Sequence, residues 1–134
     1  MKSLESKLRD AMEHKFIIPG VLPHLNEYTR QLNISKFRGS DLKRTTERLI
    51  SLHIKAQLKD VKFSDAVHIR ITWVEPNQKR DKDNIAFAKK FIFDALVSCG
   101  VLKNDGWAQI DGFSDSFLVD SDNPRVEVVL NETW

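Results

Sequence analysis

The segment AVHIRITWV, residues 66–74, constrains the fold of this chain most, because apolar and polar side chains alternate along its whole length. A period of two residues is typical of a β-strand with one buried face. The apolar set is Val67, Ile69, Ile71 and Trp73, and the polar set is His68, Arg70 and Thr72. A charged loop follows, and from Asn84 to Cys99 the period becomes helical and stops at Gly100, a residue type that commonly ends helices. This order of segments predicts a sheet with a helix packed on it.

The remaining segments predict further helices and strands around this unit. They are a short amphipathic helix over residues 3–12, a brief strand over 15–20, a loop over 22–39, a helix capped by Ser40 or Asp41 with Leu42, Leu49, Leu52 and Ala56 buried, and an alternating strand over 124–132. Helices and strands in this order indicate an α+β domain built around a small mixed β-sheet.

Length and composition favour one soluble domain. A chain of 134 residues can bury a substantial core without covalent staples. The single Cys99 cannot form an internal disulfide, which is typical of a reducing compartment. No apolar run has the length of a signal peptide core or of a membrane span. We therefore expect a cytoplasmic protein with no membrane partner.

The charges are divided unevenly along the chain. Residues 1–90 carry 19 Lys and Arg against 11 Asp and Glu, whereas residues 91–134 carry 2 against 8. A basic majority with an acidic minority suits a protein that binds a polyanion and gathers carboxylates at one site. Small domains also reach such divisions by chance.

The apolar helix over residues 84–99 has more than one apolar side. Phe87, Phe93 and Val97 lie well outside the face formed by Ile85, Ala88, Ile92, Ala95, Leu96 and Cys99. A helix that is apolar on two sides is buried on two sides. The second cover is either a partner subunit, which predicts a homodimer, or other segments of the same chain.

Three aspartates around this helix are candidate metal ligands. Asp81 and Asp83 are two residues apart in the loop before the helix, so an extended backbone projects both to one side. Asp105 follows the helix and its turn, where we expect the chain to return to the same end of the sheet. Oxygen ligands of this kind favour Mg²⁺ or Mn²⁺. The alternatives are that Asp83 caps the helix and that Asp81 is a solvated charge.

The whole stretch RDKDNIAFAKKFIFDALVSCGVLKND resembles the signature of RusA-type Holliday-junction resolvases. The matching elements are D-x-D-N at Asp81, Asp83 and Asn84, D-A-L at Asp94–Leu96, G-V at Gly100 and Val101, and Asp105. The earlier segment LPHLNEYTR is similar to the family's P-x-x-N segment through Pro23 and Asn26. The resemblance runs from about residue 16 to residue 134, so residues 1–15 form an N-terminal extension to a RusA-like nuclease domain.

This resemblance implies a homodimeric, Mg²⁺-dependent endonuclease that resolves four-way DNA junctions by symmetric phosphodiester hydrolysis. Such enzymes serve DNA recombination and repair and are often encoded by phages or prophages in bacteria. The family's three acidic residues carry over as Asp81, Asp83 and Asp105. The family's lysine, three residues after the asparagine, is Phe87 here, and the segment from Asn84 to Asp94 is longer than in the family. Lys90, and next to it Lys89, are the expected substitutes.

The basic half of the chain supplies candidate DNA contacts. They are Asn26, Arg30, Lys36, Arg38, Lys79, Arg80, Lys82 and Asn84. Lysine and arginine bind phosphates without reading base identity. Each of these cations can equally be a solvated surface charge. Two other functions stay open: a non-catalytic, structure-selective DNA-binding protein of the same fold, and a metal nuclease for other branched DNA.

Overall fold

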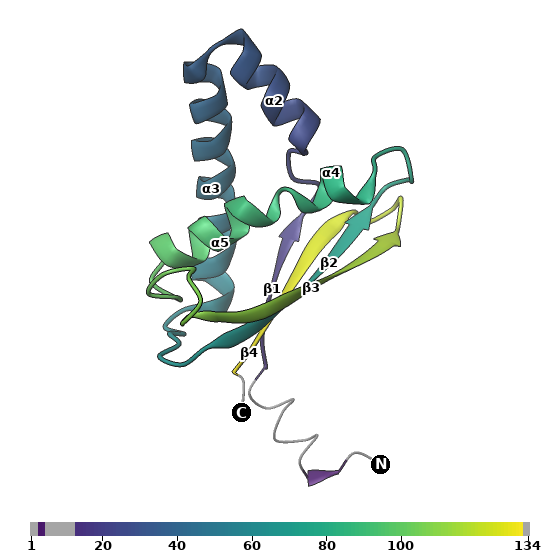
Figure 1. Ribbon diagram of the computed structural model, residues 1–134. Helices are drawn as coiled ribbons and strands as arrows, with labels where there is room; N and C mark the ends of the chain where they lie inside the picture. Colours follow the sequence, from purple (N-terminus) through teal and green to yellow (C-terminus); the bar gives the residue numbers. More distant parts are fainter. Residues whose placement is uncertain (1–2, 5–12, 133–134) are drawn as a thin grey trace.

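The computed structural model describes residues 3–4 and 13–132 (Figure 1). The helix expected over residues 3–12 lies almost entirely outside the described residues. The elements are β1 (Glu13–Pro19), α2 (Leu25–Ile34), α3 (Lys36–Leu58), β2 (Val67–Glu75), α4 (Lys82–Ala86), α5 (Lys89–Ser98), β3 (Ile110–Val119) and β4 (Arg125–Glu132).

The four strands form one mixed sheet in the order β1-β4-β2-β3. Strand β4 is antiparallel to both of its neighbours, whereas β3 runs parallel to β2 and occupies an edge. The parallel pair is joined through α4 and α5, as expected because parallel strands need a long crossover. The predicted α+β class with a small mixed sheet is confirmed.

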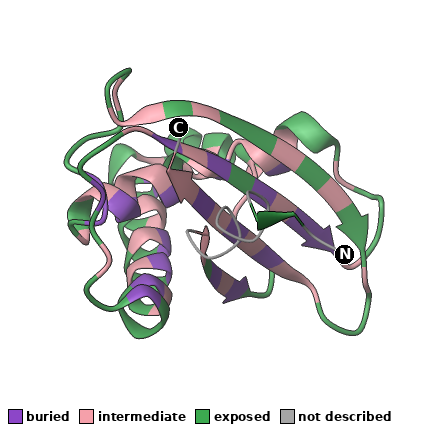
Figure 2. Cartoon of the chain, turned by 90° about the horizontal axis from the view of Figure 1, so that it is seen from below, coloured by how far each residue is buried: buried purple, intermediate pink, exposed green. Residues whose placement is uncertain are grey.

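One face of the sheet is covered by helices, mainly α3 and α5 (Figure 1). The alternation predicted for β2 is confirmed, because Val67, Ile69, Ile71 and Trp73 are all buried in the core beneath these helices. Edge strand β3 differs from the other three strands in having no buried residue, as the burial colouring of Figure 2 shows. The sheet therefore has a core side, and its edge strand β3 is the least buried of the four.

The prediction of a loop over residues 22–39 is wrong, because this segment forms α2 and the start of α3. Ser35 is the only residue between the two helices and caps both of them. No residue of α2 is buried, although Leu25, Tyr28 and Leu32 recur at helical spacing on one side of it. The buried stripe of α3 also differs from the expected one: it consists of Gly39, Thr46, Ile50, Ile54 and Leu58, while Leu49 and Leu52 are exposed.

The single helix expected over residues 84–99 is interrupted at Phe87 and Ala88, which separate α4 from α5. The backbone there forms tight bonds three residues apart, such as Ala88 N–H to the Ile85 carbonyl at 3.2 Å. The second apolar side is covered by the chain itself: Phe87 stacks on Tyr28 of α2, and Phe93 meets Phe113 of β3. Within the described residues, no helix is long and apolar enough to cross a membrane.

Candidate active site

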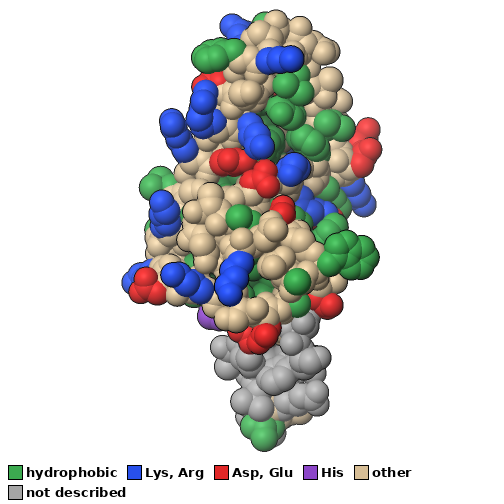
Figure 3. Space-filling model, turned by 60° about the vertical axis from the view of Figure 1, so that its left-hand side comes forward, with side chains coloured by type: hydrophobic (Ala, Val, Ile, Leu, Met, Phe, Trp, Pro, Cys, Tyr) green, Lys and Arg blue, Asp and Glu red, His purple; other side chains and the backbone are tan. Residues whose placement is uncertain are grey.

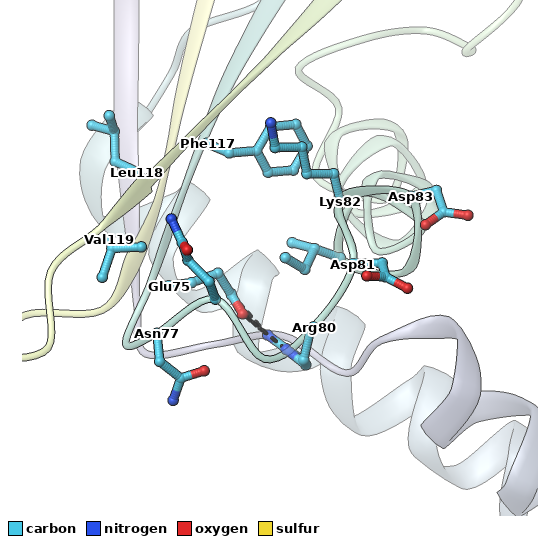
Figure 4. Close-up of a pocket in the computed structure, with 11 residues that line it drawn as sticks. Glu75, Asn77, Arg80, Asp81, Lys82, Asp83, Phe117, Leu118 and Val119 are labelled. Atoms are coloured by element: carbon cyan, nitrogen blue, oxygen red, sulfur yellow. Dashed lines mark hydrogen bonds and ion pairs between the residues drawn. The ribbon is translucent and has the colours of Figure 1, made fainter.

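A cleft of about 720 Å³ lies where β2 ends, between the loop that follows it, the start of α4 and the end of β3 (Figure 4). Its lining includes Asp81, Lys82, Asp83, Glu75 and Arg80. The cleft therefore gathers carboxylates and cations from the D-x-D-N segment at one end of the sheet.

Asp81 and Asp83 stand together at this cleft. Asp81 has extended backbone angles at the N-cap of α4, but its side chain makes no capping hydrogen bond. Asp83 lies in the first turn, and its Oδ1 accepts the N–H of the next residue, Asn84, at 3.0 Å. Both residues are exposed, and both carboxylates point to the same side in Figure 4. This pair can act on a ligand that approaches from solvent.

Lys82 projects to the opposite side from its two aspartate neighbours (Figure 4). Its Nζ lies 5.6 Å from the ring centroid of Phe117 on β3, a cation–π arrangement that holds the ammonium group across the cleft. The ammonium group and the two carboxylates therefore lie on opposite sides of the start of α4.

Glu75 and Arg80 form the rigid wall of the cleft. The Glu75 side chain is only 9% exposed, and its two oxygens accept hydrogen bonds from Arg80 Nε and Nη2, each at 2.8 Å. Arg80 Nη1 also donates to the Leu22 carbonyl at 3.3 Å. The guanidinium group, expected to contact DNA, is thus engaged inside the protein. The sequence reasoning missed Glu75, although a carboxylate closing a buried strand five residues before an arginine signals such a pair.

Asn84, also expected to contact DNA, ties two segments of the chain together. Its Oδ1 accepts the backbone N–H of Asn26 at 2.9 Å, and its Nδ2 lies 3.3 Å from His24 Nδ1. His24 caps α2 by accepting the N–H of Glu27 at 3.2 Å. The start of α2 is therefore fixed against the start of α4, next to Asp83.

Asp105 does not join Asp81 and Asp83 within one chain. It lines a separate cleft of about 280 Å³ with Phe93, Trp107 and Phe113, just before β3 begins. Since β3 runs parallel to β2, Ile110 pairs with Val67 at the start of β2, far from its end at Glu75. The expected return to the same end of the sheet is wrong. Within residues 3–4 and 13–132, no three His, Cys, Asp or Glu side chains form a group that could hold a metal ion.

The two lysines expected to replace the family lysine lie outside the cleft lining. Lys89 forms a largely buried ion pair with Asp115, which also accepts the indole N–H of Trp73 at 2.8 Å. Lys90 is exposed and pairs with Asp94 at 3.6 Å. Lys89 therefore serves the packing of α5 on the sheet, and Lys82 is the lysine nearest the paired aspartates in sequence and lines their cleft.

The other expected DNA contacts are divided between two places. Arg30, Lys36 and Arg38 are exposed on the α2–α3 hairpin, and Lys79 is exposed in the loop that borders the cleft. Asn26 lies at the base of α2 with its backbone bound to Asn84. Nearby, burial raises the pKa of Glu47, which sits between α3 and α5 close to Lys43 and Asp94.

A comparison with protein families identifies one family over most of the chain. The model of the family described as Endodeoxyribonuclease RusA matches residues 23–131. This range holds both aspartates of the cleft, Asp105 and the α2–α3 hairpin. No curated protein matches the chain. The resemblance found from the D-x-D-N and D-A-L segments is confirmed by the family match.

Proposed function

Because the chain belongs to the RusA endodeoxyribonuclease family, we propose that it resolves four-way DNA junctions by paired, metal-dependent cuts. The observation that carries this proposal is the pair Asp81 and Asp83, exposed on one side of α4 with Lys82 directed to the other. The junctions would be those of DNA recombination and repair in a bacterial cell or its phage.

The two carboxylates suit Mg²⁺, or Mn²⁺ in its place. Magnesium in phosphate-processing sites is commonly held by one or two carboxylates together with the phosphates of the substrate. When bound, such an ion lowers the pKa of a water molecule and neutralises charge on the phosphate under attack. Asp81 and Asp83 would hold the ion, and the carboxylate of Asp81 is free for this task because it makes no capping hydrogen bond.

The neighbouring residues would position the substrate. Lys82, held over Phe117, offers an ammonium group to a phosphate oxygen of the DNA strand in the cleft. The buried Glu75–Arg80 pair holds the loop that carries Lys79 and Asp81, so the ligands are oriented before DNA arrives. In this arrangement Arg80 is a positioning residue.

A homodimer through the β3 edges would bring Asp105 to the cleft. The outer edge of β3 is unpaired among the described residues, and Phe113, Leu118 and Val119 on this strand are about half exposed. Pairing two copies of β3 antiparallel about a two-fold axis sets the start of one strand beside the end of the other. The partner's Asp105 would then lie at the end of the sheet that carries Asp81 and Asp83. A two-fold dimer also matches the symmetry of paired cuts.

Cleavage of a synthetic four-way junction tests the proposal. Wild type in Mg²⁺ should place symmetric nicks in the junction and leave a linear duplex of the same sequence intact. Asp83→Asn should lose roughly a hundredfold or more of the rate while still binding the junction. Asp65→Asn, an exposed aspartate in the loop before β2, is the matched control and should cut like wild type.

Two results would replace this proposal with the alternatives. Tight junction binding without nicks in either Mg²⁺ or Mn²⁺ would identify a non-catalytic DNA-binding protein, consistent with Phe87 at the family's lysine position. Faster cutting of flaps or three-way branches than of four-way junctions would identify a nuclease for another branched DNA.

A further inference from the structure

The helical hairpin of α2 and α3 projects well beyond the sheet (Figure 1). At its end lie residues 34–38, here called the hairpin tip. Two large apolar side chains of the tip face solvent: Phe37 is 72% exposed and Ile34 is 55% exposed. Neither side chain contributes to the core of the described chain, so their exposure calls for an external partner.

The hairpin tip is held rigidly. Ser35 N–H donates to the Gln31 carbonyl at 3.1 Å, and Ser35 Oγ accepts the N–H of Arg38 at 3.1 Å, so one residue ends α2 and starts α3. The two helices also touch closely at Gly39, where an added Cβ would lie 2.2 Å from Leu32 Cδ2. The exposed Phe37 thus stands on a fixed support.

The charge of the hairpin indicates the kind of partner. Residues 24–58 contain seven Lys and Arg against three Asp and Glu. Lys36 and Arg38 flank Phe37, and in the described part of the chain neither forms an ion pair, nor does Arg30. Blue and green side chains accordingly share the top of the molecule in Figure 3. Cations around an aromatic ring suit a polyanion with stackable faces, which is nucleic acid, and they would repel the same tip of a second copy.

We propose that the hairpin tip inserts Phe37 against unstacked bases of branched DNA, while Lys36 and Arg38 hold the flanking phosphates. Apolar wedges of this kind act where base stacking is already interrupted, as it is at a branch point. This inference rests on the proposed function for its substrate class, but it concerns binding and needs no cleavage.

The geometry also predicts where the wedge acts. Helix α2 runs from Asn26, bound to Asn84 beside Asp83, out to the tip at Ile34. At a rise of about 1.5 Å per residue, the tip stands roughly 12–15 Å from the base of the hairpin. Along one DNA strand this distance spans about four nucleotides. Phe37 should therefore meet DNA about four nucleotides from the phosphate that the carboxylates engage.

Binding measurements on the full chain test the wedge. With Ca²⁺ in place of Mg²⁺, Phe37→Ala should bind a four-way junction roughly tenfold more weakly and bind linear duplex within about twofold of wild type. Phe37→Tyr should retain junction affinity, and Leu52→Ala, which removes an exposed leucine elsewhere on α3, should change neither affinity. Lys36→Ala should weaken binding to both DNAs and reduce the slope of log K against log[salt] by about 1. A photo-crosslinking p-benzoylphenylalanine at position 37 should label bases about four nucleotides from the cut.

Several outcomes would overturn the inference. Unchanged junction affinity in Phe37→Ala would do so, and so would an equal loss of affinity for junction and duplex. If Phe37→Ala instead dissociated a dimer in sedimentation, the tip would be a protein interface. Because DNA binding in Ca²⁺ is measured separately from nicking in Mg²⁺, failure of the wedge leaves the nuclease proposal standing. Conversely, a protein that never cuts but depends on Phe37 for junction binding would sustain the wedge alone.

Discussion

Asn84 accepts the backbone N–H of Asn26 through its side-chain oxygen at 2.9 Å, joining residues that are 58 positions apart in the chain. One of them belongs to the D-x-D-N segment and the other to the P-x-x-N segment. The bond fixes the base of the α2–α3 hairpin against the helix that carries Asp83. Two segments that resemble the family separately in sequence are thus one structural unit.

Replacing Asn84 with alanine should loosen the hairpin without unfolding the domain. Asn84→Ala removes the hydrogen bonds of the Asn84 side chain to Asn26 and His24 at a partly exposed helix start, which should cost about 1–2 kcal/mol of unfolding free energy. Backbone amides of α2 should exchange with deuterium faster, whereas those of β2 and β4 should not. Asn33→Ala, which changes an exposed asparagine on α2, is the control for the loss of an asparagine side chain. Uniform acceleration across the sheet would show that Asn84 supports the whole fold instead.

The Glu75–Arg80 pair should affect stability more than DNA affinity. Arg80→Ala leaves a buried carboxylate without its partner and should cost about 3 kcal/mol in chemical denaturation. The double variant Glu75→Gln with Arg80→Ala should recover part of that loss, because the stranded charge is gone. The salt slope of junction binding should stay within about 0.3 of wild type. A drop of about 1 in that slope would make Arg80 a phosphate contact after all.

The fold was predictable where burial imposes a period on the sequence. Alternation in residues 66–74 sufficed for β2 because one of its faces lies in the core. Helix α2 was missed although Leu25, Tyr28 and Leu32 recur on one side of it at helical spacing, because none of its residues is buried and its bounds are set by the caps at His24 and Ser35. Phe87, at the break between α4 and α5, stacks on Tyr28, a contact across 59 residues that no local pattern encodes.

The candidate site was predictable to the same degree. The spacing argument placed both aspartates in an extended loop, whereas only Asp81 is extended and Asp83 lies in the first turn of α4; the two carboxylates nevertheless point to one side. The position of Asp105 depends on whether β3 runs parallel or antiparallel to β2, which is a property of the sheet. Glu75 was missed because its role requires Arg80 to fold back from the following loop.

The stability of the chain should depend on pH through Glu127. Its pKa is lowered from about 4.5, first by the hydrogen bond from Lys15, at 3.0 Å, and then by Arg125. A lowered pKa in the folded state stabilises the fold above the unfolded pKa, and this contribution disappears as the pH falls through the folded pKa. Glu127→Gln should therefore lose about 1 kcal/mol at pH 7, with the gap closing below about pH 4. A gap between Glu127→Gln and wild type that persists at pH 3 would contradict the assignment.

The close approach of α2 and α3 should make Gly39 intolerant of a side chain. In Gly39→Ala the new Cβ would overlap Leu32 Cδ2 and Cγ, costing about 1–3 kcal/mol or splaying the hairpin, and the higher helix propensity of alanine offsets about 1 kcal/mol of that loss. Thermal unfolding measures the loss, and Leu32→Ala added to Gly39→Ala should recover much of it. Gly106→Ala, where the nearest atom is the end of the Gln109 side chain at 3.3 Å, is the control for a tolerated change. Equal losses for the two glycines would exclude tight helix contact at the tip.

Mixing two inactive variants should decide whether Asp105 acts across a dimer. If each site combines Asp81 and Asp83 of one copy with the partner's Asp105, then Asp83→Asn and Asp105→Asn are each inactive alone. In their heterodimer both substitutions fall in one site, so the other site contains the full wild-type set. Mixtures allowed to exchange subunits should therefore nick junctions in one strand only. Averaged over all dimers, the rate of nicking should be about a quarter of the wild-type rate, because random mixing makes about half of the dimers heterodimers and each of these has one working site out of two. The control mixes either variant with Asp65→Asn. In that mixture, paired nicks should come only from dimers in which both copies carry Asp65→Asn. Complete inactivity of the first mixture, with exchange verified by a tag on one copy, would show that Asp105 does not complete the partner's site.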